Sequence, residues 1–291
     1  MRKYLPWLFV LQLCAVRLPA ASLGVSPSGF IVHEIAPGRQ YDVYRESGVR
    51  LTINNGDDST HTYVLSSHRP STRGRWEKGY LEIPDPKWCW FDRQEVTVGP
   101  HAKGYANLLL KVPDEEKYYN QRWAVTFGIE GKPGPLGIAL AIDVRAQIET
   151  QSKADVKERP DGSIGFAPAI VSFDRWVAGR TQTRFVTVYN NDTAAHTYKI
   201  GPLFDDKNIK PMVYLTQSFK ALPDHQWLRP GAQTMRIGPK SSRKLALRLS
   251  VPALAPRENE KWEEILLAQP NKGPAGLIRI HIDAQEGTAK P

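Results

Sequence analysis

Cysteine is almost missing from this chain of 291 residues, which contains only Cys14 and Cys89. Cys14 lies in an apolar leader, so one cysteine remains for the folded part. A disulfide framework is therefore excluded, and the domains must be stabilised by their hydrophobic cores. No histidine lies near Cys89 in the sequence to activate it as a nucleophile, so we expect it to be a small buried core residue.

The sequence also lacks the short motifs that mark common catalytic sites. There is no G-x-S-x-G, no H-E-x-x-H and no glycine-rich phosphate loop. The acidic pairs Asp57-Asp58 and Asp205-Asp206 fall in turn-like segments, where surface hydration explains them. His61 and His196 have no metal-ligand companion in their strands. We therefore predict a protein that is not an enzyme and that has no cofactor and no metal; an unrecognised hydrolase is the remaining alternative.

Long apolar runs are confined to the first residues. A basic start at Arg2 and Lys3 precedes an apolar run from Tyr4 to Val16 and small residues up to Ser22. This pattern predicts a secretory signal peptide at 1–21, so we expect an exported protein (periplasmic, cell-surface or extracellular). No later stretch is apolar enough for a membrane anchor, which predicts no transmembrane segment in the mature chain.

Cys14 is not expected to carry a lipid. Bacterial lipoprotein signals need a small residue directly before the cysteine, and this chain has Leu13 there.

Acidic residues are outnumbered by basic ones, giving a net charge of +9. Removal of the predicted signal peptide takes away Arg2, Lys3 and Arg17, which lowers the charge to +6 (9 − 3). A basic exported protein is attracted to anionic envelope polymers, whereas nucleic acid is not expected in that compartment.

A repeated stretch organises the chain. VTVGPHAKGYANLLLKVP (Val96–Pro113) returns as MRIGPKSSRKLALRLSVP (Met235–Pro252), and its Gly-Pro turns are 139 residues apart (238 − 99). Each copy reads as two alternating strands joined by a short turn. The similarity extends in both directions, so the sequence predicts two copies of one β-domain.

Each copy shows about seven strands with frequent turn residues and no convincing amphipathic helix, which is typical of an immunoglobulin-like sandwich. The predicted fold is all-β, with two tandem immunoglobulin-like antiparallel β-sandwiches that arose by internal duplication. The predicted segments are the signal peptide 1–21, sandwich 1 at 23–149, a linker at 150–162, sandwich 2 at 164–285 and a disordered tail at 286–291.

Residues that recur in both copies are expected to determine the fold. Pro27 and Pro168 predict that the opening strand of each copy is an edge strand, where the missing N–H has no effect. The tryptophan pairs Trp88/Trp227 and Trp123/Trp262 are expected in the two cores. In the stretch Trp88–Phe91, regular alternation places Trp88 and Trp90 inward and the two other residues outward.

The strands that end in paired asparagine, the Gly-Pro turns and the closing Val-Pro of each copy resemble the PapD-like and major-sperm-protein-like branch of the immunoglobulin superfamily. The arrangement is also similar to the WxL-interacting surface proteins of bacteria. That resemblance implies one domain associated with peptidoglycan and one with host components, together with a C-terminal membrane anchor that this sequence does not show. Pilus chaperones, which are similar in their first domain, hold a pilin carboxylate with basic residues on the first and last strands; Arg145 lies near the last-strand position.

Features found in one copy only are the candidate contacts for a ligand or partner. A basic, aromatic loop in the first copy suits an anionic glycan or phosphate polymer, because arginine makes bidentate hydrogen bonds and tryptophan stacks on sugars. Trp90 offers an aromatic surface as an alternative to core packing. The predicted contacts are Arg69, Arg73, Arg75, Trp76, Lys78, Tyr80, Trp90 and Arg145.

The sequence thus predicts a non-catalytic, exported binding or structural protein of the bacterial cell envelope. Its expected partner is an envelope polymer or another envelope or surface protein. The alternative is a periplasmic chaperone-like or assembly subunit that acts by β-strand addition to a partner.

Overall fold

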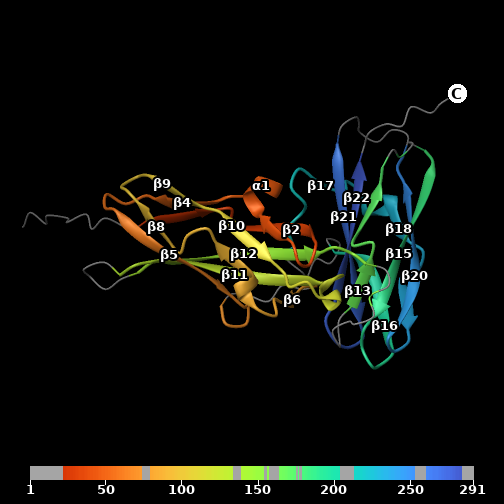
Figure 1. The fold of residues 1–291 in the computed structure, drawn as a ribbon. Helices are drawn as coiled ribbons and strands as arrows, with labels where there is room; N and C mark the ends of the chain where they lie inside the picture. The colour runs from red at the N-terminus through yellow and green to blue at the C-terminus, as the bar shows by residue number, and fades with distance from the viewer. Residues whose placement is uncertain are drawn as a thin grey trace, which may run out of the picture.

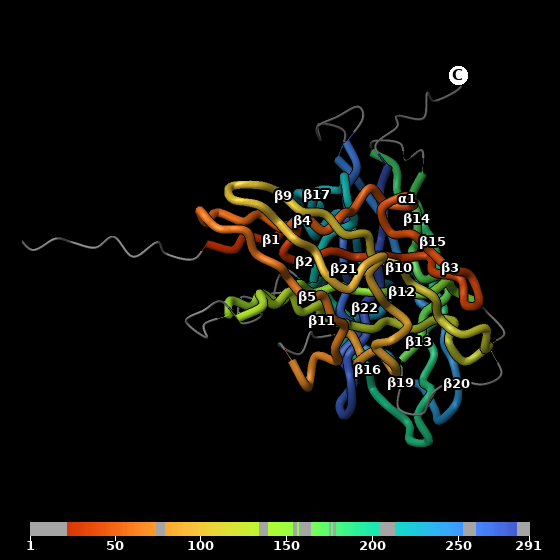
Figure 2. The backbone as a smooth tube through the Cα atoms, turned by 60° about the vertical axis from the view of Figure 1, so that its left-hand side comes forward, coloured from red at the N-terminus to blue at the C-terminus, as the bar shows by residue number. Residues whose placement is uncertain are grey.

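The computed structural model describes residues 22–73, 79–133, 139–153, 156, 164–174, 176, 179–203, 213–252 and 260–283. The chain is all-β and forms two β-sandwiches in tandem. In Figure 1 the first unit lies on the left, and its strands run across the direction of the strands of the second unit, on the right. Figure 2 shows the same crossing from a turned view. The predicted signal peptide, the predicted tail and most of the predicted linker lie outside the described residues.

The first unit has two layers. Its described strands are β1 (Leu23–Ser26), β2 (Gly29–Ile35), β3 (Gln40–Asp42), β4 (Leu51–Asn55), β5 (His61–His68), β6 (Leu81–Glu82), β7 (Cys89–Phe91), β8 (Glu95–Val98), β9 (Lys103–Ala106), β10 (Leu108–Lys111), β11 (Arg122–Gly131) and β12 (Ala141–Thr150). One layer is the sheet β2-β12-β11-β5-β8, with β6 beside β11. The other layer contains β1-β4-β9 and β3-β10-β7.

The second unit repeats this plan. Its described strands are β13 (Ile164–Ala167), β14 (Ile170–Phe173), β15 (Thr181–Asn190), β16 (His196–Pro202), β17 (Lys220–Ala221), β18 (Leu228–Pro230), β19 (Thr234–Ile237), β20 (Ser241–Ser250), β21 (Lys261–Pro270) and β22 (Gly276–Asp283). One layer is β14-β22-β21-β16-β19, with β17 beside β21, and the other is β13-β15-β20-β18. Each layer has the same strand order as its counterpart in the first unit.

Each unit opens with a segment that changes layers at a proline. Pro27 separates β1 from β2, and Pro168 separates β13 from β14; both follow a cis peptide bond. All four of these strands lie at sheet edges, as the prolines predict. The sequence analysis predicted a single opening strand in each unit, but the structure has two. A proline has no N–H to donate to the neighbouring strand, so the first strand ends there.

A short helix interrupts the first unit where the second has a continuous strand. β15 corresponds to β3 and β4, and α1 (Val43–Ser47) lies between these two. The Asp42 side chain accepts hydrogen bonds from the first turn, and Gly48 ends the helix at a φ of 73°. We predicted no helix here, because five residues are too few for an amphipathic repeat.

The tryptophans lie in the two cores, but the alternation predicted for Trp88–Phe91 is wrong. Trp88 ends the 3-10 turn η1 (Pro86–Trp88), so the strand begins only at Cys89. Cys89 and Phe91 are consequently buried, and Trp90 faces outward and is half-buried. The Trp88 ring still packs edge-on against buried Trp123, with 5.6 Å between ring centroids.

A buried asparagine ends the same strand in each unit. The Asn55 side-chain nitrogen donates to the carbonyls of Ser59, Val98 and Gly99. Asn190 makes the same three types of contact in the second unit. Asn55, the second residue of the pair Asn54-Asn55, is therefore the structural equivalent of Asn190, the first residue of the pair Asn190-Asn191.

Candidate functional site

The two sandwiches meet at a buried seam between the outer faces of β11 and β12 and those of β21 and β22. In β11 Trp123 points into the first core, so Arg122 and Ala124 point outward, toward the second unit. An apolar cluster at the seam contains Tyr80, Ala124, Leu203, Val213, Ile265 and Leu277. The seam therefore has a small hydrophobic core of its own.

Arg279 in β22 is the centre of this seam and is completely buried. Its Nε donates to Glu149 Oε1 at 2.7 Å, and its Nη2 donates to the Tyr80 hydroxyl at 2.8 Å. Its Nη1 donates to Glu263 Oε1 at 2.7 Å and to the carbonyl of Tyr214 at 3.0 Å. One guanidinium thus binds an acid from each unit.

A second arginine crosses the seam in the opposite direction. Arg122 of the first unit donates from Nη2 to the carbonyl of Ala169 at 3.1 Å. Its guanidinium lies 5.0 Å from the centre of the Phe166 ring, and its Nε lies 3.4 Å from Glu149 Oε1. Each unit therefore extends an arginine to the other, and Glu149 lies between the two.

Glu149 is ionised in this environment. Burial by itself would raise the pKa of its carboxyl group, but the positive charges of Arg279 and Arg122 and the hydrogen bonds from Arg279 and Tyr80 outweigh burial and lower the pKa to about 2. Burial also raises the pKa of Tyr80 well above its usual value. The Tyr80 hydroxyl therefore stays protonated and donates to Glu149 Oε1 at 2.5 Å.

Glu263 is held by its own unit as well. Its carboxylate accepts the Thr216 N–H at 2.6 Å and lies 3.4 Å from His281 Nε2. Burial favours the neutral acid, but the hydrogen bond from His281 and the charge of Arg279 lower the pKa of Glu263 overall. The seam thus balances two arginines against two carboxylates.

Gly79 lets the chain approach the seam closely. Its φ is +89°, and a Cβ atom there would lie 2.5 Å from the side chain of Leu277. Only glycine meets both conditions without displacing the second unit.

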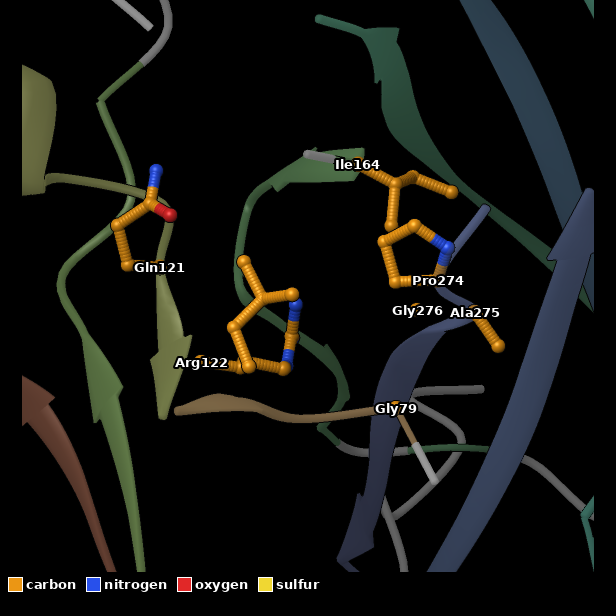
Figure 3. Close-up of a pocket in the computed structure, with 8 residues that line it drawn as sticks. Gly79, Gln121, Arg122, Ile164, Pro274, Ala275 and Gly276 are labelled. Atoms are coloured by element: carbon orange, nitrogen blue, oxygen red, sulfur yellow. The ribbon is translucent and has the colours of Figure 1, made fainter. Parts of the chain in front are cut away.

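Figure 3 shows a small pocket at the seam. Gln121 and Arg122 of the first unit face Ile164, Pro274 and Ala275 across a pocket of about 10 Å³. A cavity of this size has room for about one water molecule. The seam is a packed contact and has no space for an organic ligand at this point.

Two predicted contacts of the basic loop are engaged by the first unit itself. Arg73 lies on the outer face of β11 and β12, where it forms ion pairs with Glu130 and with Asp143, the latter at 2.6 Å. Arg69 donates to the carbonyl of Pro84. The predicted contacts Arg75, Trp76 and Lys78 lie outside the described residues.

The other predicted contacts lie in different places. Tyr80 is buried in the seam. Arg145 is half-buried on the outer face of β12, opposite Thr126. Trp90 lies on the outer face of β7, beside a hollow of about 270 Å³. The structure brings Arg73 and Arg145 to one sheet face and does not join Tyr80 or Trp90 to them.

The sequence prediction missed the seam residues Glu149, Glu263 and Arg279. Arg279 lies between two isoleucines of its strand, as an ordinary solvent-facing residue does. Glu149 is followed by Thr150 and Glu263 by Glu264, so neither acid stands out from a polar stretch in its strand. Alternation shows which face a residue occupies, but it does not show that another domain covers that face.

Two kinds of catalytic group can be assessed in the described part of the chain, a metal site and the Cys89 thiol. It contains no group of three or more His, Cys, Asp or Glu side chains placed to hold a metal ion. Burial raises the pKa of the Cys89 thiol, which disfavours the reactive thiolate. No helix among these residues is long and apolar enough to span a membrane.

No family model matches the chain, and no curated protein matches it. Among solved structures it is similar to a protein of unknown function from Porphyromonas gingivalis W83, with 12% identity over 90% of this chain and 99% of that one, and a TM-score of 0.37. It is also similar to the E. coli chaperone DraB (10% identity, 90% and 98% covered, TM-score 0.32). PapD-like domain 7 of human CEP192 covers 51% of this chain and all of its own (11% identity, TM-score 0.34). Similarities at this level assign no partner or activity to this chain.

Proposed function

We propose that this chain is a non-catalytic, exported binding protein of the bacterial cell envelope, whose two sandwiches act as one rigid body. The observation that supports this proposal is the contact of Arg279 with carboxylates of both units. Contacts between domains of one chain are usually polar and permit motion. Here any sliding would leave charges unpaired in a buried site, which is strongly unfavourable.

A rigid pair of sandwiches suits binding to an extended partner. The seam covers the outer face of the first large sheet at Arg122, Ala124 and Glu149, and it extends to β2, where His33 packs against His281. Outer faces away from the seam, such as that of β7 with Trp90 and that of β18 with Arg229, are held at a fixed mutual angle. An envelope polymer or surface protein in contact with both units would then bind without the entropic cost of ordering them first.

The proposal is tested by sedimentation of the mature protein with isolated bacterial envelope material. We expect the protein to pellet with the envelope at low salt and less at high salt, because exposed charges are screened. We also expect no soluble fragments to be released from the envelope. Protein that stays in the supernatant at both salt concentrations, or release of fragments, would contradict the proposal.

A second candidate function is strand addition, which an open sheet edge favours. On one side, β12 pairs with β11 from Ala141, opposite Glu130, to Glu149, opposite Arg122. On its other side, β12 pairs with β2 only from Arg145 onward. Among the described strands, none covers the other side of Ala141–Val144. Arg145 donates its N–H toward β2, so in a regular strand the N–H of Ala141 points to the same, uncovered side.

Replacing Ala141 with proline tests this candidate. Ala141→Pro removes an edge N–H without removing a hydrogen bond to β11, so the fold should persist. If a partner adds a strand here, copurification of that client should fall about fivefold or more, on the scale of a lost backbone hydrogen bond. The control Ala141→Ser keeps the N–H and should retain the client. Equal recovery with both variants would exclude strand addition at this edge.

A further inference from the structure

Two arginines face each other on the outer face of the second unit. Arg229 of β18 and Arg248 of β20 are direct cross-strand partners, and both are exposed. Like charges directly opposite in an antiparallel pair destabilise the sheet. Within the described residues neither arginine forms an ion pair; Arg229 Nε donates to the carbonyl of Gln226 at 3.2 Å, which orients its guanidinium. The pair is therefore a local cost to the fold.

The first unit shows that the fold does not require this pair. The corresponding positions 139 residues earlier are Trp90 and Leu109, which are also direct cross-strand partners. An apolar pair thus fits the same place in the same strands. Because the sandwich forms without the two charges, their presence in the second unit needs another explanation.

The surroundings of the arginine pair (Arg229 and Arg248) suit an anionic ligand. The strands of this sheet, β13, β15, β18 and β20, contain no acidic residue, and their basic residues are Arg184, Arg229, Arg243, Lys244 and Arg248. Lys244 lies on the same outer face as Arg248, 5.4 Å from the centre of the exposed Phe185 ring. The face therefore carries positive charge that no strand of its own sheet neutralises.

The arginine pair lies beside a hollow of about 590 Å³. Thr181 and Ser250, which pair across the strands, line this hollow with their short hydroxyl side chains. The corresponding pair in the first unit is Gln40 and Lys111, whose side chains are longer. Half-buried Trp227 lines the hollow as well. Among the described residues that line it, the one acidic residue is Asp224, whose Oδ1 accepts the N–H of Gln226 and so caps the 3-10 turn η3 (His225–Trp227).

We propose that Arg229 and Arg248 bind the phosphate or sulfate groups of an anionic glycan on the outer face of the second unit. Two guanidinium groups present paired N–H donors that match oxyanion geometry, and a bound oxyanion would neutralise the repulsion between them. Trp227 and the two hydroxyl groups in the hollow suit the sugar part of such a chain. The inference goes beyond the proposed function, because it assigns a ligand class and a site to one unit.

The test uses binding of the full mature chain to dextran sulfate, with uncharged dextran and inorganic polyphosphate as comparison ligands. Arg248→Leu, which places the first unit's residue in the second, should weaken binding of dextran sulfate about tenfold or more, as expected for lost charged hydrogen bonds. It should also raise the Tm by about 1–3 °C, because the like-charge repulsion is removed. The matched control Arg236→Leu removes one exposed arginine from β19, on the other sheet of the same unit. It should leave both quantities nearly unchanged.

The outcomes separate this inference from the proposed function. Equal weakening by Arg248→Leu and Arg236→Leu would overturn the site, and binding of polyphosphate as tight as that of dextran sulfate would overturn the glycan assignment. A third outcome is that Arg248→Leu loses binding of dextran sulfate but sediments with the envelope as the wild type does. The site is then supported, and the envelope partner binds at another surface of the protein. If the wild type binds dextran sulfate but does not sediment with the envelope, the proposed function fails and the site stands.

Discussion

Replacing Arg279 with alanine should lower the free energy of unfolding by about 3–5 kcal/mol, the range for removal of one partner from a buried ion pair. Arg279 is completely buried and hydrogen-bonded to Glu149 and Glu263. Without it, two carboxylates remain in a site that water cannot reach well. Denaturant unfolding of the mature chain measures this loss, and we expect a separate, earlier transition as the two units come apart.

Two further variants make this prediction specific. Arg279→Lys keeps the charge but cannot reproduce the fork of donors, so it should recover only part of the loss. The control Lys132→Ala removes an ion pair with Glu95 in which both side chains are about half exposed, at 52% and 48%. It should change stability by at most about 1 kcal/mol. A small effect of Arg279→Ala, similar to that of the control, would show that the seam does not hold the units together.

Acidification should destabilise the protein strongly between about pH 4.5 and pH 2. The folded-state pKa of Glu149 is lowered from 4.5 to about 2. A carboxyl group with a lowered folded-state pKa stabilises the protein above its unfolded pKa, and this contribution is lost as the pH falls through the folded value. A shift of this size corresponds to about 3 kcal/mol. Glu263, whose pKa is also lowered, should act in the same direction, whereas Glu264, whose pKa is raised by burial, acts in the opposite one.

The measurement is the free energy of unfolding as a function of pH for the wild type and for Glu149→Gln. The variant lacks the titrating group, so its stability should decline less over this window, although it starts lower at neutral pH. Glu95→Gln serves as a control, since its half-exposed partner Lys132 stays hydrated; its decline should match that of the wild type. Parallel curves for the wild type and Glu149→Gln would show that Glu149 is not the group responsible.

Much of the fold was predictable because local patterns specify it. The alternation in Glu95–Val98 and Thr234–Ile237 predicts half-buried strands, and the structure has β8 and β19 there. Pro27 and Pro168 predict edge strands for the same local reason. The errors were also local: Asp85 caps a 3-10 turn that ends at Trp88, which shifts the alternation of the following strand by one residue.

The sequence by itself determined the all-β architecture and its duplication, because strand alternation and turn residues act over a few neighbours and recur at a fixed offset. Only the tertiary structure decided which outward-facing residues are solvated and which are buried. Arg279 and Arg248 both alternate with apolar residues on their strands, yet one is buried against Glu149 of the other unit and the other is exposed opposite Arg229. Whether such an arginine is buried depends on whether another domain covers its face of the sheet. For Arg279 that cover comes from residues more than a hundred positions earlier in the chain.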